Sequence, residues 1–481
     1  MASNKDSKET FKFEDGRSIA DALREIQEVY SADNRPWVIG YSGGKDSTAT
    51  LQLVWNAIVE LKPEQRKKRV YVISSDTLVE TPVIVDFTNR TIERINETAA
   101  QNNMPFQAVK LKPRETQTFW INLIGRGYPA PQQSFRWCTD RLKILPSNDF
   151  IMEKISKHGE VVLVLGVRRA ESMTRAQVMS LYQIPGSLLS RHSRFPRAYV
   201  YTPIKDFTVD DVWGYLLSNP SPWGSNNRDL LTLYKHATGE CPLVVDDVTP
   251  SCGGSRFGCW VCTVVERDKS MESLISSGEE WMRPLLEIRD FLSSTQDPKM
   301  KPIYRELKRR QGMVSFKSDG SGIISRGPYK LEFCKEVLRR LLKAQIDVRR
   351  KGPDPGMQLI SPEELHEIRR IWRMERGDWE DSAPQIYRQI IGSDLEWMRD
   401  DLGSFSEKES FLLNEICTTH GVPTRLVTKL LDTEMQLQGM SRRSSIYNRI
   451  EQALSEEWRT EEDILRYIQA GNSAPKTSKE K

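Results

Sequence analysis

The segment Ser42–Ser47 (Ser-Gly-Gly-Lys-Asp-Ser) has the composition of a phosphate-binding turn. Gly43 and Gly44 let the backbone turn tightly and bring its N–H groups close to a ligand. The apolar helical pattern that follows adds the unpaired N–H donors and the positive dipole end of a helix start. Lys45 supplies a cation and Ser42 a hydroxyl. The spacing differs from that of a Walker loop, so we predict a phosphate site of another kind.

A second cluster of functional residue types lies at residues 165–175, after an apolar run. Gly166 is followed by Arg168, Glu171 and Arg175. An arginine fork donates two parallel hydrogen bonds to a phosphate and keeps its charge at all physiological pH values. A solvated loop has the same composition, so the cluster alone leaves both interpretations open.

Cys138 lies among the cations Arg136, Arg141 and Lys143. A positive field favours the thiolate, which can accept sulfane sulfur and carry it as a persulfide. A structural cysteine and an additional ligand to a metal cluster are the alternatives.

Four of the seven cysteines form a group with the spacing Cys241-x10-Cys252-x6-Cys259-x2-Cys262. Four thiolates can bind zinc tetrahedrally or hold a [4Fe–4S] cluster. Only the last pair has a spacing common to both, so the spacing does not choose the metal.

The first three of these groups lie in residues 36–217, which must position them. This part of the chain alternates between short apolar strands and helices. The expected strands are 37–41, 69–74, 105–111 and 160–167, with helices at 48–61 and 82–101. This alternation predicts an α/β fold with a doubly wound parallel sheet. Ligands bind beyond the carboxyl ends of such strands. The segments 42–47, 75–77 (with Asp76) and 168–172 are therefore expected to converge there.

The rest of the chain predicts a modular organisation. We expect an N-terminal lead (1–35), the nucleotide domain (36–217), a four-cysteine segment (218–269), a basic helical extension (270–470) and a disordered tail (471–481). The extension has basic runs near aromatic residues, at 301–310, 339–340, 349–351 and 369–373. Such runs suit a nucleic-acid backbone, although solvated helix faces often look the same.

Composition narrows the class of protein. The 481 residues are 38% hydrophobic and 28% charged, with a net charge of +4, which is compatible with a nucleic-acid partner without requiring one. No apolar run approaches a membrane span, and residues 1–15 lack a signal-peptide core. We therefore expect a cytoplasmic protein with no membrane partner, in which clustered cysteines serve metal binding or catalysis.

The loop at 42–47 resembles the pyrophosphate (PP) loop of the ATP pyrophosphatase superfamily, whose fold is adenine nucleotide alpha hydrolase-like. This resemblance implies that ATP is cleaved between its α and β phosphates through an adenylated intermediate. Residues 165–175 and 202–213 resemble the phosphoadenylylsulfate (PAPS) reductase branch, and residues 136–146 resemble its Cys-x4-Lys-x2-Pro region. The reductases' C-terminal nucleophile motif has only a loose counterpart around Cys417, which argues against sulfate reduction.

The whole chain resembles the DndC family, the sulfurtransferases of bacterial DNA phosphorothioation. The resemblance implies that sulfur replaces a non-bridging backbone oxygen of DNA. Implied cofactors are ATP, Mg²⁺ and a [4Fe–4S] cluster. Implied partners are DNA, DndD- and DndE-like proteins and a cysteine desulfurase.

The expected catalytic residues are Cys138, Lys45, Asp46, Arg168, Glu171 and Arg175, and the expected nucleotide-binding residues are Ser42, Gly43, Gly44, Lys45, Asp46, Ser47, Asp76, Gly166 and Arg168. Cys241, Cys252, Cys259 and Cys262 are the expected metal ligands. Two alternatives remain open, a tRNA thiolation enzyme of the iron–sulfur type and a nucleotide-sensing subunit without catalysis.

The iron–sulfur interpretation predicts that protein purified without oxygen is brown and that Cys259→Ser removes the colour, because a cluster ligand is lost. Absorption spectra and metal analysis provide the test. A colourless wild-type protein with one equivalent of zinc would contradict the prediction.

Overall fold

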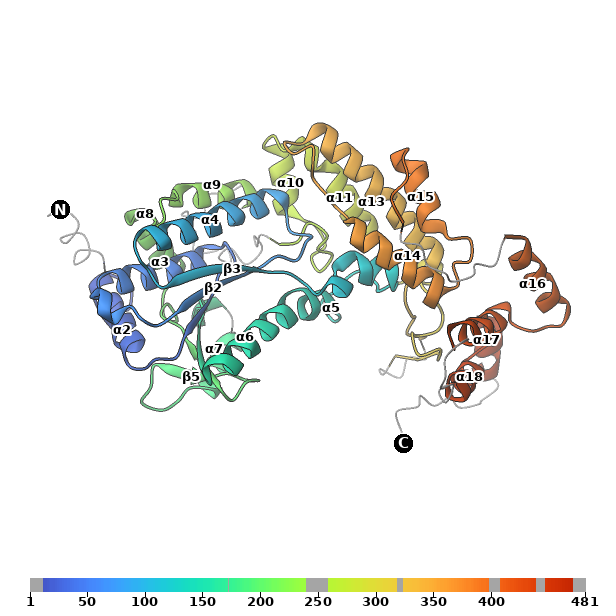
Figure 1. The fold of residues 1–481 in the computed structure, drawn as a ribbon, viewed down its shortest axis with the longest axis horizontal. Coiled ribbons are helices and arrows are strands. Elements are labelled where there is room, and N and C mark those ends of the chain that lie inside the picture. The colour runs from blue at the N-terminus through green and yellow to red at the C-terminus, as the bar shows by residue number, and fades with distance from the viewer. Residues whose placement is uncertain are drawn as a thin grey trace. The chain divides into compact units, whose positions relative to one another are not determined.

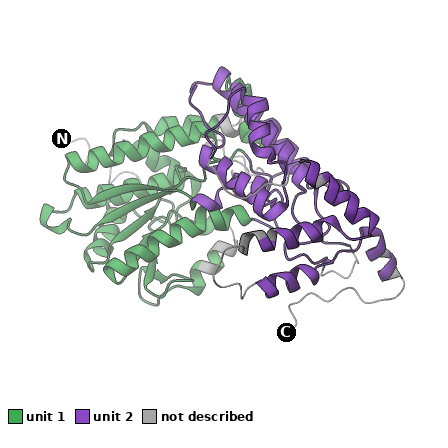
Figure 2. Ribbon diagram, turned by 45° about the vertical axis from the view of Figure 1, so that its right-hand side comes forward, with its two compact units in different colours: residues 1–114, 137–260, 267–280 green, residues 115–136, 261–266, 281–481 purple. Residues whose placement is uncertain are grey.

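The computed structural model describes residues 12–171, 173–238, 258–317, 323–397, 407–437 and 446–469. The chain divides into two compact units, each built from several segments (Figure 2). Unit 1 comprises residues 1–114, 137–260 and 267–280, and unit 2 comprises residues 115–136, 261–266 and 281–481.

Unit 1 is built around a six-stranded sheet of order β3-β2-β1-β4-β6-β5. Its strands are β1 (Trp37–Gly40), β2 (Val70–Ser75), β3 (Phe106–Leu111), β4 (Val161–Val164), β5 (Leu189–Arg191) and β6 (Ala198–Tyr201). All neighbouring strands are parallel except β5 and β6. Trp37 of β1 is in register with Val70 of β2 on one side and Val162 of β4 on the other. The strand order therefore reverses at β1, which is where such sheets bind ligands.

Helices cover both faces of this sheet (Figure 1). The helices on one face are α2 (Ile19–Ser31), α3 (Lys45–Val59), α4 (Pro82–Gln101), α8 (Val209–Ser218) and α9 (Asn227–Thr238). Helix α6 (Leu145–His158) packs against the other face through Phe150, Ile151 and Ile155. Val38 faces the α6 side while Ile39 faces the α3 side, as the alternation of a strand requires. The prediction of an α/β doubly wound fold is confirmed.

Shorter elements complete unit 1. They are η1 (Pro63–Gln65), α5 (Trp137–Thr139), η4 (Asp140–Ile144), η5 (Arg169–Glu171), α7 (Met173–Leu181) and α10 (Lys269–Ser276). The expected strands agree with β1 to β4 within a few residues, and α4 has the expected bounds. The sequence analysis missed β5 and β6, whose three and four residues are too short to show a clear period.

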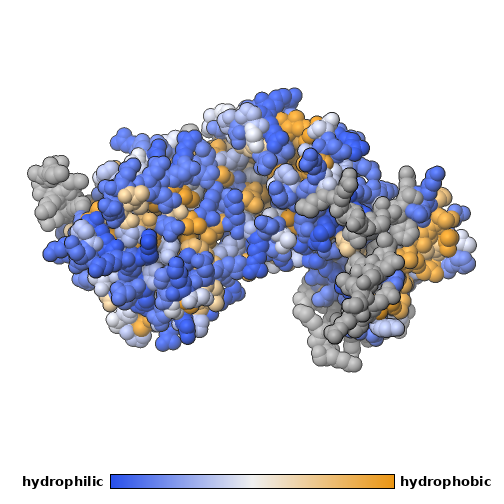
Figure 3. All heavy atoms as spheres, viewed as in Figure 1, coloured by the Kyte–Doolittle hydropathy of each residue, from blue (hydrophilic) through white to orange (hydrophobic). Residues whose placement is uncertain are grey.

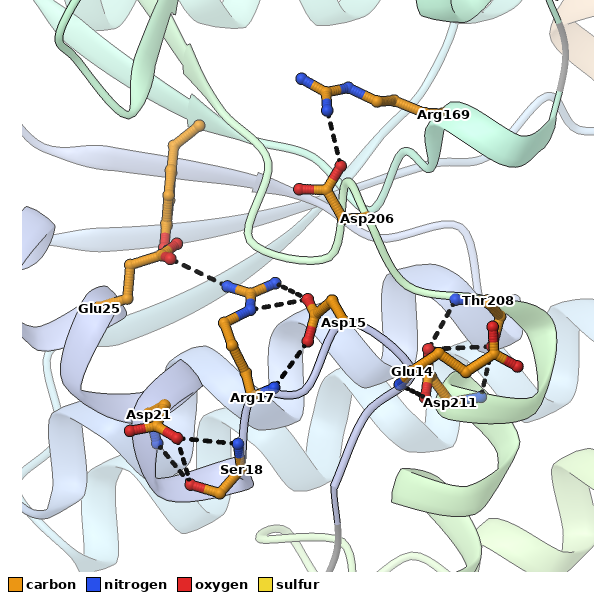
Figure 4. Close-up of polar contacts among 11 residues, drawn as sticks. Glu14, Asp15, Arg17, Ser18, Asp21, Glu25, Arg169, Asp206, Thr208 and Asp211 are labelled. Carbon is orange, nitrogen blue, oxygen red and sulfur yellow. Dashed lines mark hydrogen bonds and ion pairs between the residues drawn. The ribbon is translucent and has the colours of Figure 1, made fainter.

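The segment before β1 is integrated into unit 1. Phe13 is buried and stacks on Phe207 with ring centroids 4.0 Å apart. The backbone N–H of Glu14 donates to Asp211 at 3.0 Å, while Arg17 pairs with Glu25 at 2.9 Å (Figure 4). Residues 12–31 thus pack on the same face of the sheet as α3.

Helices are the main elements in the described parts of unit 2. Its elements are η2 (Glu115–Gln117), η3 (Ile121–Gly125), η6 (Glu280–Met282), α11 (Arg283–Ser294), α12 (Lys301–Tyr304), α13 (Leu331–Lys351), α14 (Pro362–Arg376), α15 (Ser382–Ile391), α16 (Glu407–Thr419), α17 (Thr424–Leu437), α18 (Ile446–Leu454) and α19 (Glu461–Gln469). Two buried indoles connect its segments, because Trp120 donates to Leu359 O at 2.8 Å and Trp372 to Ile124 O at 2.9 Å. Helix α16 exposes apolar side chains, visible as an orange area in Figure 3.

No helix among the described residues is both long enough and apolar enough to span a membrane.

The carboxyl end of β4 approaches the start of α3 so closely that only glycine fits at position 166. A Cβ at Gly166 would lie 2.7 Å from the carbonyl oxygen of Asp46 and 2.8 Å from Oγ1 of Thr50. We therefore expect Gly166→Ala to lower the free energy of unfolding by about 1–3 kcal/mol, the usual cost of overpacking.

Urea denaturation measures this change. Gly356→Ala is a suitable control, because its Cβ would meet only a side-chain oxygen of Asp354 at 3.2 Å, and we expect an effect below about 0.5 kcal/mol. Equal stabilities of the two variants would contradict the close approach.

Candidate functional site

The loop between β1 and α3 has the geometry of an anion-binding turn. Gly43 has a φ of +75°, a conformation that side chains with a Cβ rarely adopt. Gly44 is the N-cap of α3 and provides no side-chain cap for the first turn. The backbone N–H groups at such a helix start, together with the helix dipole, favour a phosphate.

The two serines at the ends of the loop stabilise its shape. The N–H of Ser42 donates to Oγ of Ser47 at 3.2 Å, and the two hydroxyl oxygens are 3.1 Å apart. Ser47 in turn donates to the carbonyl oxygen of Gly44 at 2.9 Å. These bonds close the loop on itself, so both serines have a structural role in addition to any contact with a ligand.

Asp46 joins the two cations of the loop region. Its Oδ1 accepts a hydrogen bond from Nε of Arg168 at 2.6 Å, and its Oδ2 lies 3.3 Å from Nζ of Lys45. Arg168 comes from the segment after β4, and its side chain is only 5% exposed. The structure thus brings together three of the predicted catalytic residues at the point where the strand order reverses.

Tyr234 of α9 is a site residue that the sequence analysis missed. Its hydroxyl accepts a hydrogen bond from the N–H of Lys45 at 3.2 Å, and its ring centroid lies 5.5 Å from Nζ of Lys45. A Cβ at Gly44 would also meet this hydroxyl at 3.2 Å. No motif marks Tyr234, because an aromatic residue in an amphipathic helix normally indicates only core packing.

The other predicted nucleotide-site residues have different surroundings. Asp76 follows β2, and its carboxylate pairs with Nζ of Lys110 at 3.0 Å and accepts from the N–H of Leu78 at 2.9 Å. Glu171 ends η5 and Arg175 lies in α7, but their side chains are outside the described parts of the structure.

The loop after β2 is hydrogen-bonded to the segment that contains Cys259. The backbone of Glu80 pairs with that of Cys259, and the N–H of Trp260 donates to Val79 O at 3.0 Å. The hydroxyl of Thr77 lies 3.2 Å from Sγ of Cys259. The thiol of Cys259 is therefore positioned at the same edge of the sheet as the β1–α3 loop, one strand away.

Lys143 connects Cys259 with Cys138. Its ammonium lies 3.1 Å from the carboxylate of Glu80. Burial lowers the pKa of Lys143, but negative charge on Cys259, Glu80 and Cys138 outweighs burial and raises it above its ordinary value. Two cysteines that are 121 positions apart in the sequence thus share one cation. A cation in this position favours thiolates, the form that carries sulfur or binds a metal.

The remaining predicted metal ligands are only partly described. The carbonyl oxygen of Cys262, in unit 2, accepts a hydrogen bond from Nε of the buried Arg289 at 3.0 Å. Cys241 and Cys252 lie outside the described residues. Among the residues that are described, no three His, Cys, Asp or Glu side chains gather at one point. The surroundings of Cys259 fit a thiolate ligand, and the rest of the ligand set stays a prediction.

Cys334 and Cys417 are both buried. Burial raises the pKa of the Cys334 thiol, which is unfavourable for a nucleophile.

Comparisons with known proteins agree with this architecture. Residues 36–264 match the phosphoadenosine phosphosulfate reductase domain. Residues 412–455 match a family described as a small protein found in certain Dnd DNA modification systems. An uncharacterized protein of Methanocaldococcus jannaschii is 23% identical over 293 residues, which are 60% of this chain and 50% of that protein. The chain thus spans about half the length of this curated relative.

Three solved structures are similar at low identity. A PAPS reductase from Candida auris in complex with phosphate is 14% identical, with a TM-score of 0.30, over 44% of this chain and 85% of that one. The FMN adenylyltransferase of Candida glabrata with FAD and pyrophosphate is 12% identical, with a TM-score of 0.26, over 48% and 65%. The U34-tRNA thiolase NcsA from Methanococcus maripaludis with its [4Fe-4S] cluster is 12% identical, with a TM-score of 0.29, over 60% and 83%.

The class of protein follows from the fold and the matched domain. Residues 36–264 resemble a PAPS reductase domain, and the sheet has the doubly wound form of nucleotide-binding proteins. The fold and the matched domain together define the chain as an α/β protein with a PAPS reductase-like domain at residues 36–264.

The buried pair of Asp46 and Arg168 provides a test of the site geometry. Asp46→Asn removes the charge that neutralises a buried guanidinium, so we expect the free energy of unfolding to fall by about 3 kcal/mol. Asp206→Asn is the matched control. Asp206 pairs at 2.8 Å with the neighbouring Arg169, whose side chain is 42% exposed (Figure 4), and we expect a loss below about 1 kcal/mol.

Urea denaturation of the two variants measures the difference. Equal losses in the free energy of unfolding would mean that the guanidinium of Arg168 is solvated and does not depend on the ion pair with Asp46.

Proposed function

We propose that this protein is a sulfurtransferase of the DndC type, which uses ATP to replace a non-bridging oxygen of the DNA backbone by sulfur. The observation that carries the proposal is the convergence in unit 1 of two kinds of chemistry. The β1–α3 loop has a positive φ at Gly43 and an uncapped helix start, which support a phosphate site there. Cys138 and Cys259 share the cation Lys143 close to the neighbouring strand β2.

ATP would bind with its phosphates at the start of α3. The loop 42–47 offers backbone N–H donors, while Lys45 and Arg168 offer positive charge. Asp46 already faces both cations, and its carboxylate would also help to hold Mg²⁺, which would neutralise phosphate charge when it is bound. A DNA phosphate oxygen then attacks the α phosphorus, pyrophosphate leaves, and the DNA phosphate is activated as an adenylate.

Sulfur would reach the activated phosphate from Cys138. A cysteine desulfurase would load Cys138 as a persulfide, whose terminal sulfur attacks the phosphorus and displaces AMP. A second thiol then attacks the sulfur of Cys138, which leaves the transferred sulfur on the DNA phosphate and forms a disulfide. A dithiol reductant restores the thiols. Lys143 supports this sequence because its charge stabilises anionic sulfur at Cys138.

The cysteine group would complete the sulfur site. Cys241, Cys252, Cys259 and Cys262 would hold a [4Fe–4S] cluster, which supplies iron sites for sulfur delivery or electron transfer when it is bound. Thr77 orients Cys259 from the side of the β2 loop, through the contact of 3.2 Å between its hydroxyl and Sγ. Hydrogen bonds of this kind to a ligand sulfur tune a cluster's potential.

The setting in a Dnd system accounts for the partners that we propose. The match at residues 412–455 supports association with such a system. DNA would be the substrate, and DndD- and DndE-like proteins would act alongside this chain.

Mass spectrometry of nuclease-digested DNA and RNA tests the proposal in cells that carry the full gene set. We expect phosphorothioate-linked dinucleotides with the wild-type protein and none with Cys138→Ser, because the sulfur carrier is removed. Cys417→Ser is the control, since this buried thiol lies in α16 of unit 2, and its modification level should equal that of the wild type.

Other outcomes decide against parts of the proposal. Thionucleosides in tRNA that depend on Cys138, with unmodified DNA, would make the protein a tRNA thiolation enzyme. Unchanged DNA modification in Cys138→Ser would refute the carrier role.

A further inference from the structure

One segment of unit 2 concentrates positive charge far beyond the average of the chain. The described parts of residues 297–330, which we call the basic hairpin, contain nine Lys and Arg and two Asp and Glu, whereas the whole chain contains 70 and 66. The structure describes residues 297–317 and 323–330 of this segment. Its charge excess is therefore larger than the net charge of +4 of the entire protein.

The described parts of the segment run antiparallel to each other. Bridges join Arg305 with Tyr329 and Phe316 with Ile324. The N–H of Glu306 donates to Pro328 O at 2.8 Å, and the N–H of Lys317 donates to Ile323 O at 2.9 Å. In Figure 1 this segment is the yellow chain beside α14. The pairing fixes the spacing of its cations, so they act as an ordered group.

The basic runs on the long helices of unit 2 are of a different kind, because carboxylates neutralise them. On α13, Arg340 pairs with Glu336 at 2.8 Å and Arg350 with Asp347 at 2.7 Å. On α14, Arg370 pairs with Glu367 and Arg369 with Asp381, each at 2.7 Å. The sequence suggested four basic runs for DNA contact. In three of them, at 339–340, 349–351 and 369–373, the arginines named above are thus neutralised by carboxylates.

In the basic hairpin, cations face other cations. The guanidinium of Arg305 donates to Gly327 O at 2.7 Å, and that of Arg309 donates to Arg326 O at 3.1 Å. Burial and the nearby charges of Arg309 and Arg326 lower the pKa of Arg305. Burial and the charges of Arg305 and Lys317 likewise lower the pKa of Lys301. Backbone carbonyls hold these groups in place but do not cancel their charge.

Contacts with residues 425–461 involve some charges of the basic hairpin. Two of its cations meet carboxylates there, since Lys308 lies 3.8 Å from Glu456 and Arg326 pairs with Glu461. Its own carboxylate Glu306 pairs with Arg425 at 3.1 Å, so this contact removes no positive charge from the hairpin. The exposed cations outside these contacts are Lys299, Arg309, Arg310 and Lys317. Arg310 also lies against an aromatic residue, since it donates to the hydroxyl of Tyr128 at 2.6 Å.

We propose that the basic hairpin binds the sugar–phosphate backbone of duplex DNA. This inference rests on the proposed function, because it assigns a surface to that substrate. Several ordered cations in a row match a polymer of phosphates, which releases counterions on binding. A guanidinium beside an aromatic ring is a frequent element of nucleic-acid surfaces. An anionic membrane is the less fitting partner, since Ile303 and Ile323 expose separate apolar side chains and the segment forms no amphipathic helix.

Fluorescence anisotropy with the full-length protein and a labelled 30-base-pair duplex tests this assignment over a range of salt concentrations. The test variant is Arg309→Ala/Arg310→Ala/Lys317→Ala. Each lost phosphate contact removes about 0.9 from the slope of log K against log salt, so we expect the slope to fall by about two to three. At low salt we expect the Kd to rise at least tenfold.

The control removes the same charge from α13 and α14, in the variant Arg340→Ala/Arg350→Ala/Arg370→Ala. These arginines are exposed, and each pairs with its own carboxylate, Glu336, Asp347 or Glu367, so the Kd should stay within about twofold of the wild type, since their charges are already balanced. Thermal denaturation confirms that both variants are folded.

The outcomes separate this inference from the proposed function. If both variants weaken DNA binding equally, or if the test variant does not weaken it, the assignment of the hairpin is wrong. Neither result would contradict the proposed function in DNA modification. Hairpin-dependent binding to RNA but not to DNA would overturn DNA as the partner. Binding to anionic vesicles but not to nucleic acid would make the hairpin a membrane surface.

Discussion

The buried ion pair between Asp46 and Arg168 is the interaction on which the arrangement of unit 1 depends. Asp46 is in the first turn of α3, after β1, and Arg168 follows β4. Because β1 and β4 are neighbours at the point of strand-order reversal, the pair closes the edge of the sheet where a ligand would bind. The contact requires that β4 approach α3 without a side chain between them, which explains glycine at position 166. A buried guanidinium without this partner would be strongly unfavourable, so the charge pair and the close packing depend on each other.

The thiols to which we assign sulfur chemistry, those of Cys259 and Cys138, belong to the same edge of the sheet. Strand β2 lies beside β1 in parallel, and the loop that follows it holds the backbone of Cys259 through Glu80 and Val79. Neighbouring strands are about 4.8 Å apart, so a nucleotide at the β1–α3 loop and a thiol at the β2 loop belong to adjacent positions. Lys143 then brings Cys138 into the same electrostatic environment. In the function that we propose, the parallel sheet would thus place phosphate activation and sulfur transfer side by side, although their residues are far apart in the chain.

Much of this could be predicted from the sequence, because strands β1 to β4 and helices α3 and α4 have strong local patterns. The glycines of the loop could also be recognised, since the residue types that a turn requires are adjacent in the sequence. Contacts between distant segments could not be predicted. The hydroxyl of Tyr234 at the loop, the backbone pairing of Glu80 with Cys259, and the burial of Phe13 on Phe207 all depend on tertiary packing. Charge patterns were the least informative, because a sequence shows which residues are basic but not which of them carboxylates neutralise.

The presence or absence of neutralising carboxylates distinguishes two kinds of positive charge in the molecule. At the nucleotide loop two cations share the single carboxylate of Asp46, which leaves about one positive charge plus roughly half a charge from the helix start. A triphosphate carries several negative charges, so the loop by itself would not balance the ATP that we propose as its ligand, and a divalent cation would have to enter with it. The basic hairpin has the opposite design, with several cations that carbonyls orient but do not neutralise. A small ligand that arrives with its own metal ion needs limited positive charge and tight geometry. A long polyanion without a fixed metal needs many exposed charges, and the described part of the hairpin carries four of them, at Lys299, Arg309, Arg310 and Lys317.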